Sequence, residues 1–355
     1  MTLLTASRQF DRIDSEGQLA SLALVLAQAG GKVTAEERAL GRGHGSPSDA
    51  LVERVTGSIL AGSDPLGDSF MSVRSGQERR RSGAVYTPNA IVASMMAWAR
   101  RYGTPSRVVD PGAGTGRFVL AAARSFPTAT LVAVEIDPLA TLMLKANAHV
   151  MGLGSRLTVE ALDYRLLSLP ACEGRTLFLG NPPYVRHHEI SSHWKTWFSE
   201  SAGKLGLKAS KLAGLHAHFF LRTAQLARAG DYGAFITSAE WLDVNYGSVL
   251  RQLIARHLGG VGLHMIAPTA LPFEGTNTTG LISTFEVGSG AEALVVDKSA
   301  SMLGLGDLRS GSRISRDRAM QEDRWSALFR PRSSSANGSV ELGELFRVHR
   351  GQVTG

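Results

Sequence analysis

Val108-Val109-Asp110-Pro111-Gly112-Ala113-Gly114-Thr115-Gly116 is an apolar run that leads into a glycine-rich turn. Residues 117–120 follow at once and have the character of a helix start. Glycines let the backbone of such a strand-turn-helix unit come close to a ligand. The spacing GxGxG after Asp-Pro suits a pyrophosphate site less well than GxGxxG does. We therefore expect Gly112, Gly114 and Gly116 to line a cofactor site, and the turn alone does not fix which cofactor.

Short β-rich runs on both sides of this turn alternate with helical stretches. They occupy residues 107–110, 131–136, 157–161, 176–179, 233–237, 260–266 and 281–287. This alternation predicts a doubly wound α/β sheet that is covered by helices on both faces. Ligand sites in such sheets lie beyond the carboxyl ends of the strands. Each motif that we single out falls at the end of a predicted strand.

Acidic residues follow the second and third of these strands. Glu135 ends the second strand, about 20 residues after the glycines, where a carboxylate can accept both hydroxyls of a ribose. This arrangement suits NAD as well as S-adenosylmethionine, so it predicts adenosine binding and leaves the cofactor open. Asp163 and Tyr164 follow the third strand. There the carboxylate can accept a hydrogen bond from an adenine amino group, and the ring can pack on the purine.

Asn181-Pro182-Pro183-Tyr184 ends the fourth strand in a rigid turn. Proline fixes φ and has no N–H, so the turn presents carbonyl oxygens and a positioned asparagine. The amino group of a base is a poor nucleophile because its lone pair is delocalised into the ring. If Asn181 and the Pro182 carbonyl accept its two hydrogens, the nitrogen becomes pyramidal and its lone pair can attack a methyl group. Tyr184 is expected to stack on a base drawn out of the helix.

These motifs, together with Tyr86-Thr87-Pro88, resemble in their order the gamma class of amino-group DNA methyltransferases, which includes the TaqI-type N6-adenine enzymes. The resemblance covers roughly residues 65 to 290 and implies a seven-stranded class I methyltransferase sheet with S-adenosyl-L-methionine as cofactor. It implies catalytic roles for Asn181, Pro182, Pro183 and Tyr184. It implies a second aromatic face for the target base, for which Phe273 is our candidate. The cofactor residues it implies are Tyr86, Thr87, Pro88, Asp110, Gly112, Gly114, Gly116, Glu135, Ile136, Asp163 and Tyr164.

The chain divides into three predicted regions. We expect a helical N-terminal extension over residues 1–70, the methyltransferase domain over 71–290, and a linker with the start of a truncated target-recognition region over 291–355. A capped helix start is predicted at Thr34 to Glu37, and helical spacing runs over residues 19–29 and 50–60. The sequence gives no indication of what the N-terminal extension does.

Charge and composition favour a polyanionic partner, and we expect double-stranded DNA. The 355 residues carry a formal charge of +7. The segment 185–211 is a candidate loop over the DNA. Arginines that we consider for phosphate contacts follow further on, at Arg309, Arg313, Arg316, Arg318, Arg324, Arg330 and Arg332. Without a signal peptide or a long apolar run, the chain is expected to be cytoplasmic. We expect no metal, because His187 and His188 are adjacent and Cys172 is the sole cysteine.

Several alternatives remain open from the sequence. N4-cytosine methylation is chemically close, although there the turn more often begins with serine or aspartate. Enzymes that act on RNA guanine or on a protein glutamine amide must also methylate a planar, weakly nucleophilic amino group. They resemble this chain less at Tyr86-Thr87-Pro88. A catalytically dormant DNA-binding subunit is a further alternative. Cytosine-C5 chemistry is excluded because Cys172 lies before the fourth strand. We expect that recognition of the DNA sequence, and any nuclease activity, is supplied by a missing region or by a separate partner.

Overall fold

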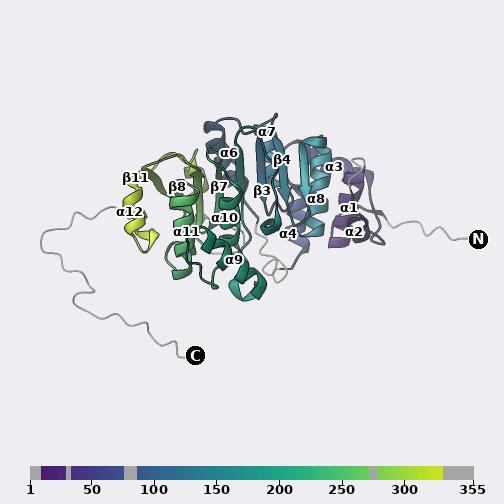
Figure 1. Ribbon diagram of the computed structural model, residues 1–355. Coiled ribbons are helices and arrows are strands. Elements are labelled where there is room, and N and C mark those ends of the chain that lie inside the picture. The colour runs from purple at the N-terminus through teal and green to yellow at the C-terminus, as the bar shows by residue number, and fades with distance from the viewer. Residues whose placement is uncertain (1–8, 29–32, 76–85, 271, 273–277, 331–355) are drawn as a thin grey trace, which may run out of the picture.

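The computed structural model describes residues 9–28, 33–75, 86–270, 272 and 278–330 (Figure 1). The helices are α1 Glu16–Gln28, α2 Ala35–Leu40, α3 Asp49–Leu60, α4 Pro65–Val73, α6 Asn89–Arg101, α7 Arg117–Ser125, α8 Pro138–Val150, α9 Ser192–Lys204, α10 Leu215–Leu226, α11 Ser248–Gln252 and α12 Arg316–Gln321. The strands are β1 Gln9–Phe10, β2 Ser46–Pro47, β3 Arg107–Pro111, β4 Thr130–Val134, β5 Leu157–Glu160, β6 Thr176–Gly180, β7 Tyr232–Ser238, β8 Gly260–Ile266, β9 Gly280–Glu286, β10 Ala293–Ser299 and β11 Ser312–Ser315.

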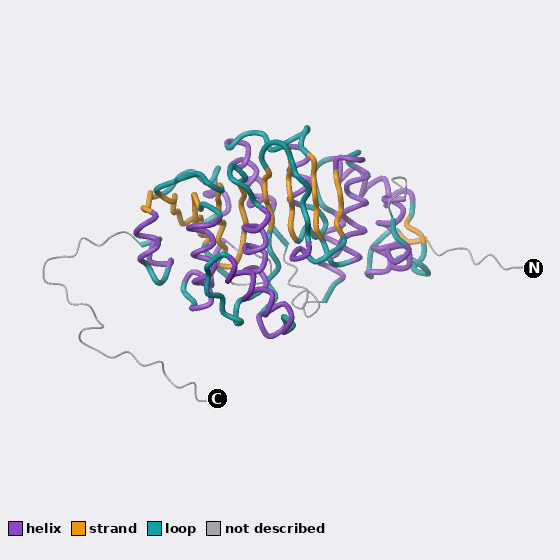
Figure 2. The backbone as a smooth tube through the Cα atoms, in the orientation of Figure 1, coloured by secondary structure: helices purple, strands orange, loops and turns teal. Residues whose placement is uncertain are grey.

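A sheet of nine strands forms the centre of the molecule, in the order β11-β10-β8-β9-β7-β6-β3-β4-β5 (Figure 2). Strands β3 to β9 are the seven that the sequence predicts, and the doubly wound α/β fold is confirmed. β9 runs antiparallel to both of its neighbours, β7 and β8. β3, β4, β5 and β6 pair in parallel. Their carboxyl ends therefore meet at one edge, where the glycine turn and the other motifs lie.

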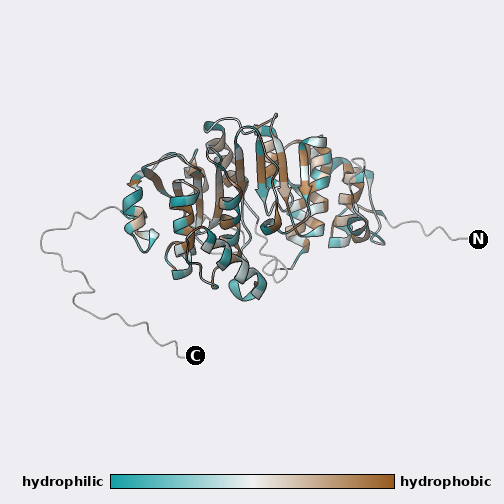
Figure 3. Ribbon diagram, in the orientation of Figure 1, coloured by the Kyte–Doolittle hydropathy of each residue, from teal (hydrophilic) through white to brown (hydrophobic). Residues whose placement is uncertain are grey.

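Helices cover both faces of the sheet, and the apolar strands lie between them (Figure 3). On one face α6 and α7 pack over the strands, with buried side chains such as Trp98 and Phe118. On the other face α10 and α11 contribute Phe220 and Leu250 to a second core. Burial on both faces explains why β3 and β6 consist entirely of buried residues.

The sheet continues past residue 290, where the sequence pattern weakens. β10 pairs in parallel with β8, and β11 pairs antiparallel with β10. Arg316, one of the arginines considered for phosphate contact, is instead engaged in this part of the fold. Its guanidinium donates to the backbone carbonyls of Ala255, Gly260 and Ala291. The predicted linker therefore does not begin at residue 291. The strand pattern is weak here because β10 ends in polar residues and β11 has a single apolar residue, Ile314.

The N-terminal helices α1 to α4 pack against α8 and form a third core (Figure 1). Leu19 and Leu22 of α1 meet Leu142 and Met143 of α8, and all four are fully buried. The helix start predicted at Thr34 carries a complete capping box with Glu37. The described residues before β3 are therefore mostly helical. Within the described ranges, no helix has the length and apolar character needed to cross a membrane.

Candidate active site

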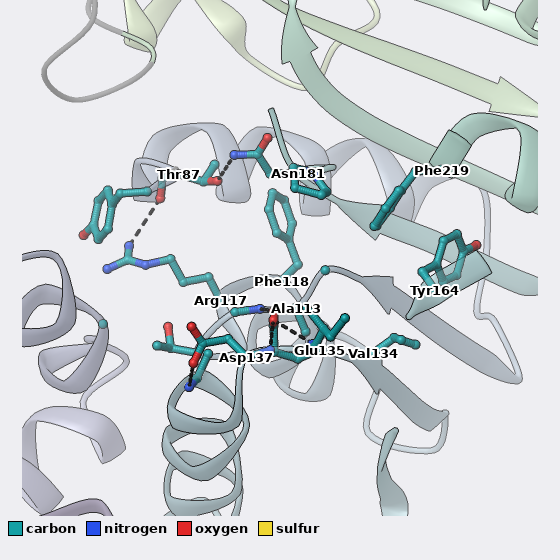
Figure 4. Close-up of a pocket in the computed structure, with 18 of the residues that line it drawn as sticks. Thr87, Ala113, Arg117, Phe118, Val134, Glu135, Asp137, Tyr164, Asn181 and Phe219 are labelled. Carbon is teal, nitrogen blue, oxygen red and sulfur yellow. Dashed lines mark hydrogen bonds between the residues drawn. The ribbon is translucent and has the colours of Figure 1, made fainter. Parts of the chain in front are cut away.

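A cavity of about 440 Å³ opens at the carboxyl ends of β3, β4, β5 and β6 (Figure 4). Its size is typical of sites for nucleotide-sized ligands. The glycine turn after β3, Glu135 after β4, Asp163 after β5, and Asn181 with Pro183 after β6 all line it. The structure therefore brings together residues that lie far apart in the sequence, at the edge where the sheet predicts a ligand site.

The glycine turn adopts backbone conformations that disfavour side chains. Gly112, Gly114 and Gly116 have φ of +68°, +55° and +99°. Gly112 and Gly114 line the cavity, and a Cβ on Gly114 would meet no atom within 4 Å. A Cβ on Gly116 would instead lie 2.4 Å from Leu144 Cδ1. The first two glycines thus keep the cavity open, whereas Gly116 permits the turn to pack on α8.

Asp110 lies behind the turn. Its side chain is fully buried, and Oδ2 accepts a hydrogen bond of 3.0 Å from the backbone N of Val119. Burial raises the pKa of Asp110 well above its usual range. The hydrogen bond to Val119 links the end of β3 to the first turn of α7. Asp110 therefore supports the glycine turn from below, which differs from the direct cofactor contact that we expected from the sequence.

Glu135 is held in place by three backbone N–H groups. Oε2 accepts from Gly114 at 2.7 Å, and Oε1 accepts from Ile136 and Asp137, both at 2.8 Å. Burial raises the pKa of Glu135, and these donors act in the opposite direction. The neighbouring Ile136 has 68% of its surface exposed beside the cavity. The carboxylate thus has a fixed orientation, and Ile136 offers an apolar surface next to it.

Asp163 forms an ion pair that the sequence did not predict. Arg165 contacts both carboxylate oxygens, with Nε to Oδ1 at 2.9 Å and Nη2 to Oδ2 at 2.5 Å. Burial alone would raise the pKa of Asp163, but the Arg165 contacts outweigh it and the pKa is lowered. The Arg165 guanidinium lies 3.7 Å from the centre of the Trp194 ring. Asp163 is therefore held ionised as a hydrogen-bond acceptor at the cavity wall.

Two aromatic rings, Tyr164 and Phe219, form part of the cavity wall (Figure 4). Tyr164 is 2% exposed, and its hydroxyl is hydrogen-bonded to Thr223 Oγ1 at 2.9 Å. Its ring centre lies 5.0 Å from that of Phe219 on α10. The sequence offered no sign of Phe219, because it resembles the other core residues of an apolar helix.

The Asn181 side chain is joined to the loop before α6. Nδ2 donates to Thr87 Oγ1 at 3.0 Å, as Figure 4 shows. Arg117 donates to the Thr87 carbonyl at 3.3 Å, and its guanidinium lies 3.4 Å from the centre of the Tyr86 ring. Tyr86 and Thr87 line the cavity together with Asn181, and Pro88 caps the start of α6. The two motifs, which lie far apart in the sequence, therefore form one structural unit.

Tyr184 is half-buried and turns toward the sheet. Its hydroxyl donates to the carbonyl of Ile236 at 3.4 Å, and its ring packs against the core of that face. Burial raises the pKa of Tyr184 well above its usual range. Pro182 is buried, and Pro183 lines the cavity. Phe273, the second candidate for the target base, lies outside the described residues.

The segment 185–211 is largely helical and holds α9. Arg186, Lys204, Lys208 and Lys211 are exposed along it. Trp197 instead stacks on His218 of α10, with ring centres 5.9 Å apart. Burial lowers the pKa of His218 to about 3, so this imidazole is neutral. Lys204 ends α9, and the other three basic residues lie in the segments just before and after this helix, whose Trp194 contacts Arg165. Among the described residues, no group of three or more His, Cys, Asp and Glu side chains could hold a metal ion.

Helix α4 supplies a wall of the cavity that the sequence did not reveal. Gly67, Phe70, Met71 and Arg74 line it opposite the strand ends. A nine-residue helix in a region without motifs carries no signal of this role. The cavity has the features that S-adenosylmethionine needs. It has open glycine backbone, a fixed carboxylate at Glu135 and an acceptor flanked by aromatic rings at Asp163.

Comparison with known proteins supports the assignment of the fold. The structure aligns with the type IIG restriction endonuclease BpuSI at a TM-score of 0.61 and 16% identity, over 88% of this chain and 44% of that one. It aligns with a protein from Listeria monocytogenes, assigned to the class I S-adenosylmethionine-dependent methyltransferases, at a TM-score of 0.52 and 10% identity, over 81% and 92%. The chain therefore has the fold of the class I S-adenosylmethionine-dependent methyltransferases.

The sequence comparisons add relatives with restriction-modification roles. Residues 176–264 match the Eco57I restriction-modification methylases. Over 97% of its length the chain is 48% identical to the type II methyltransferase M.XamI of Xanthomonas campestris pv. amaranthicola, and it spans 65% of that relative. The chain is therefore similar to methyltransferases of restriction-modification systems and spans less than two thirds of that relative's length.

Proposed function

We propose that this protein methylates the N6 amino group of adenine in double-stranded DNA, with S-adenosylmethionine as the methyl donor. The observation that carries the proposal is the position of Asn181. It lies at the rim of the cofactor cavity and is fixed there by Thr87. A rigid amide at that place suits an amino group that must be oriented toward a bound cofactor.

In this proposal the cofactor is held by residues at three strand ends and by the loop before α6. Glu135 accepts hydrogen bonds from the ribose hydroxyls, and Ile136 packs beside them. Asp163 accepts from the adenine amino group, and Tyr164 packs on the purine. The loop at Tyr86 and Thr87 and the turn at Gly112 and Gly114 enclose the methionine part. When bound, S-adenosylmethionine supplies an electrophilic methyl group on a sulfonium.

Asn181 and Pro182 prepare the nucleophile. Because Asn181 Nδ2 donates to Thr87, the orientation of the amide, and hence of its oxygen, is set. That oxygen and the Pro182 carbonyl each accept one hydrogen of the target amino group, so that its lone pair points into the cavity. Acceptance of the methyl group would leave the nitrogen positively charged until it released one proton to solvent. The two acceptors stabilise this developing positive charge.

The target base reaches Asn181 only outside the DNA helix, since the amino group of a paired base is inaccessible to the cavity. Tyr184 holds one face of this base, and we assign the other face to Phe273. The exposed basic residues of the segment 185–211, on α9 and on both sides of it, contact the phosphates. Recognition of the DNA sequence, and any nuclease activity, we assign to a part of the protein beyond residue 330 or to a separate partner.

Transfer of a tritiated methyl group to unmethylated DNA tests the proposal, with Asn181→Ala as the control. We expect Asn181→Ala to lower the transfer rate on the order of 100-fold or more. Mass spectrometry of the digested nucleosides then identifies the base. N6-methyladenine is expected, N4-methylcytosine would correct the substrate, and no transfer in the presence of a recognition partner would refute the enzyme assignment.

A second candidate is methylation of RNA or of a protein amide by the same chemistry. The similarity over 97% of this chain to a type II methyltransferase favours DNA. The same labelled cofactor, offered with RNA or with total protein, separates these substrates. A dormant DNA-binding subunit is disfavoured because the Asn181–Thr87 contact and the Glu135 carboxylate are both in place.

A further inference from the structure

The cavity wall opposite the strand ends belongs to the N-terminal helices. Phe70, Met71 and Arg74 of α4 and its end line the same cavity as Glu135 and Gly114. Phe70 is 6% exposed, while Met71 is partly exposed. None of the motifs that define the methyltransferase sheet lies in this helix. The cavity is therefore bounded on one side by a unit that lies outside the sheet.

One anchor of α4 lies at the glycine turn. Asp64, which caps α4 through Gly67 N at 2.9 Å, also accepts from Thr115 Oγ1 at 2.6 Å. The same carboxylate pairs with Arg117 Nε at 3.1 Å. Its side chain is only 9% exposed. A buried carboxylate with this many donors is costly to displace. Asp64 thus connects the start of α4 to the turn that approaches the cofactor.

The other anchor lies next to Glu135. Arg74, at the end of α4, pairs with Asp137 at 2.5 Å and with Glu16 of α1 at 2.8 Å. Its guanidinium also lies 4.2 Å from the centre of the Phe70 ring. Asp137 caps α8 and follows Glu135 by two residues. Arg74 thus connects the N-terminal helices to the turn that orients the Glu135 carboxylate.

We propose that the N-terminal helical unit, formed by α1 to α4, is part of the cofactor site and contributes to cofactor binding. In this proposal α4 closes the site as a clamp. Phe70 and Met71 contact bound S-adenosylmethionine, and Asp64 and Arg74 are positioning residues that seat the helix and stiffen the glycine and Glu135 turns. The inference rests on the proposed use of this cofactor. It gives residues 9–75 a function that the sequence motifs do not.

Binding of S-adenosylmethionine and S-adenosylhomocysteine, measured by calorimetry without DNA, tests the clamp. Arg74→Met is expected to weaken binding about tenfold or more, because it breaks the connection to the Glu135 turn. In turnover, KM for the cofactor should rise, with kcat at saturation close to that of the wild type. Equal affinity of Arg74→Met and the wild-type protein would overturn the proposal.

Lys145→Met is a matched control. The Lys145–Glu37 pair, at 2.6 Å, joins α8 to α2, and its side chains are 16% and 4% exposed. It connects the same two units with similar burial, and neither residue lines the cavity. We expect Lys145→Met to lower thermal stability while the cofactor affinity stays unchanged. If it weakens binding as much as Arg74→Met does, α4 acts only through general stability and the proposal fails.

Met71 provides a test that does not depend on the ion pairs. Met71→Ala removes a partly exposed contact, so the protein should fold, and affinity should fall several-fold. Met71→Leu conserves the volume of the side chain, so its affinity for the cofactor should be close to that of the wild-type protein. If neither substitution changes binding, Met71 makes no contact with the cofactor and the clamp is refuted. If the wild-type chain itself binds neither ligand, the proposed function fails as well, which separates the two outcomes.

Discussion

Asn181 Nδ2 donates to Thr87 Oγ1 across 3.0 Å, between residues 94 positions apart in the chain. The contact links the loop before α6 to the turn after β6. It fixes the amide of the proposed catalytic residue from the cofactor side. The orientation of Asn181 therefore depends on a residue that does not itself act on the base.

Replacing the Thr87 hydroxyl tests whether the orientation of Asn181 depends on it. Thr87→Val keeps the shape of the side chain but removes the acceptor, so the Asn181 amide is free to rotate. We expect the single-turnover methylation rate at saturating cofactor to fall about 3- to 10-fold, the size of one lost hydrogen bond. Thr87→Ser retains the hydroxyl and should stay near the wild-type rate. A Thr87→Val protein as fast as Thr87→Ser would show that the contact is dispensable.

Two glycines of the same turn should respond differently to one added methyl group. Gly114→Ala places its Cβ in open space at the cavity, so cofactor affinity should fall and stability should fall by about 1 to 2 kcal/mol from backbone strain. Gly116→Ala adds a collision with Leu144 to that strain, and it should lose more stability. Urea unfolding and calorimetric binding measure the two effects. The contrast is contradicted if both variants lose the same stability.

Two substitutions of Tyr184 distinguish the role of its ring from the role of its hydroxyl. Tyr184→Phe removes the hydroxyl, including its 3.4 Å hydrogen bond to Ile236, which should cost about 1 kcal/mol of stability and leave the methylation rate nearly unchanged. Tyr184→Leu removes the stacking face, and the rate should fall about 5- to 100-fold. Fluorescence of 2-aminopurine at the target position reports whether the base leaves the helix. Unchanged fluorescence and rate in Tyr184→Leu would place base stacking elsewhere.

Arg165 keeps Asp163 ionised, so the contribution of this ion pair to the stability of the protein depends on pH in a predictable direction. The folded pKa of Asp163 is lowered, so the ion pair stabilises the protein above the unfolded pKa, and this stability is lost as the pH falls through the folded pKa. Arg165→Met should cost about 3 kcal/mol near neutral pH, because it leaves a buried carboxylate without its partner. The difference from the wild-type protein should be largest near neutral pH. It should narrow as the pH falls, first through the pKa of the unpaired Asp163 carboxylate, which burial raises in the variant, and then through the lowered pKa of the wild-type carboxylate.

Urea unfolding of the wild-type and Arg165→Met proteins at a series of pH values measures this difference. Arg313→Met serves as the control, since Arg313 is exposed on β11. A difference between wild type and Arg165→Met that does not change with pH would mean that Arg165 stabilises the fold through Trp194 rather than through Asp163.

The strand pattern and the strand-end motifs were predictable because both follow from local chemistry. A buried parallel strand needs a continuous apolar run, and a turn such as Gly112 to Gly116 needs glycine. The partners of these residues were not predictable. Phe219 on Tyr164 and Arg74 on Asp137 depend on which elements the fold brings together, and Arg165 on Asp163 depends on the conformation of one short turn. β11 escaped prediction because it is an edge strand with mostly exposed residues, and β10 because its buried residues alternate with partly exposed ones.

Helix α8 belongs to two cores. Leu142 and Met143 pack on the N-terminal helices, while Leu144 and Ala148 pack on the sheet. Neither side can melt without exposing apolar surface of the other, so the two units are thermodynamically one folding unit. An engineer who transplants the catalytic sheet into another enzyme must therefore take the first 75 residues with it, or redesign the outer surface of α8.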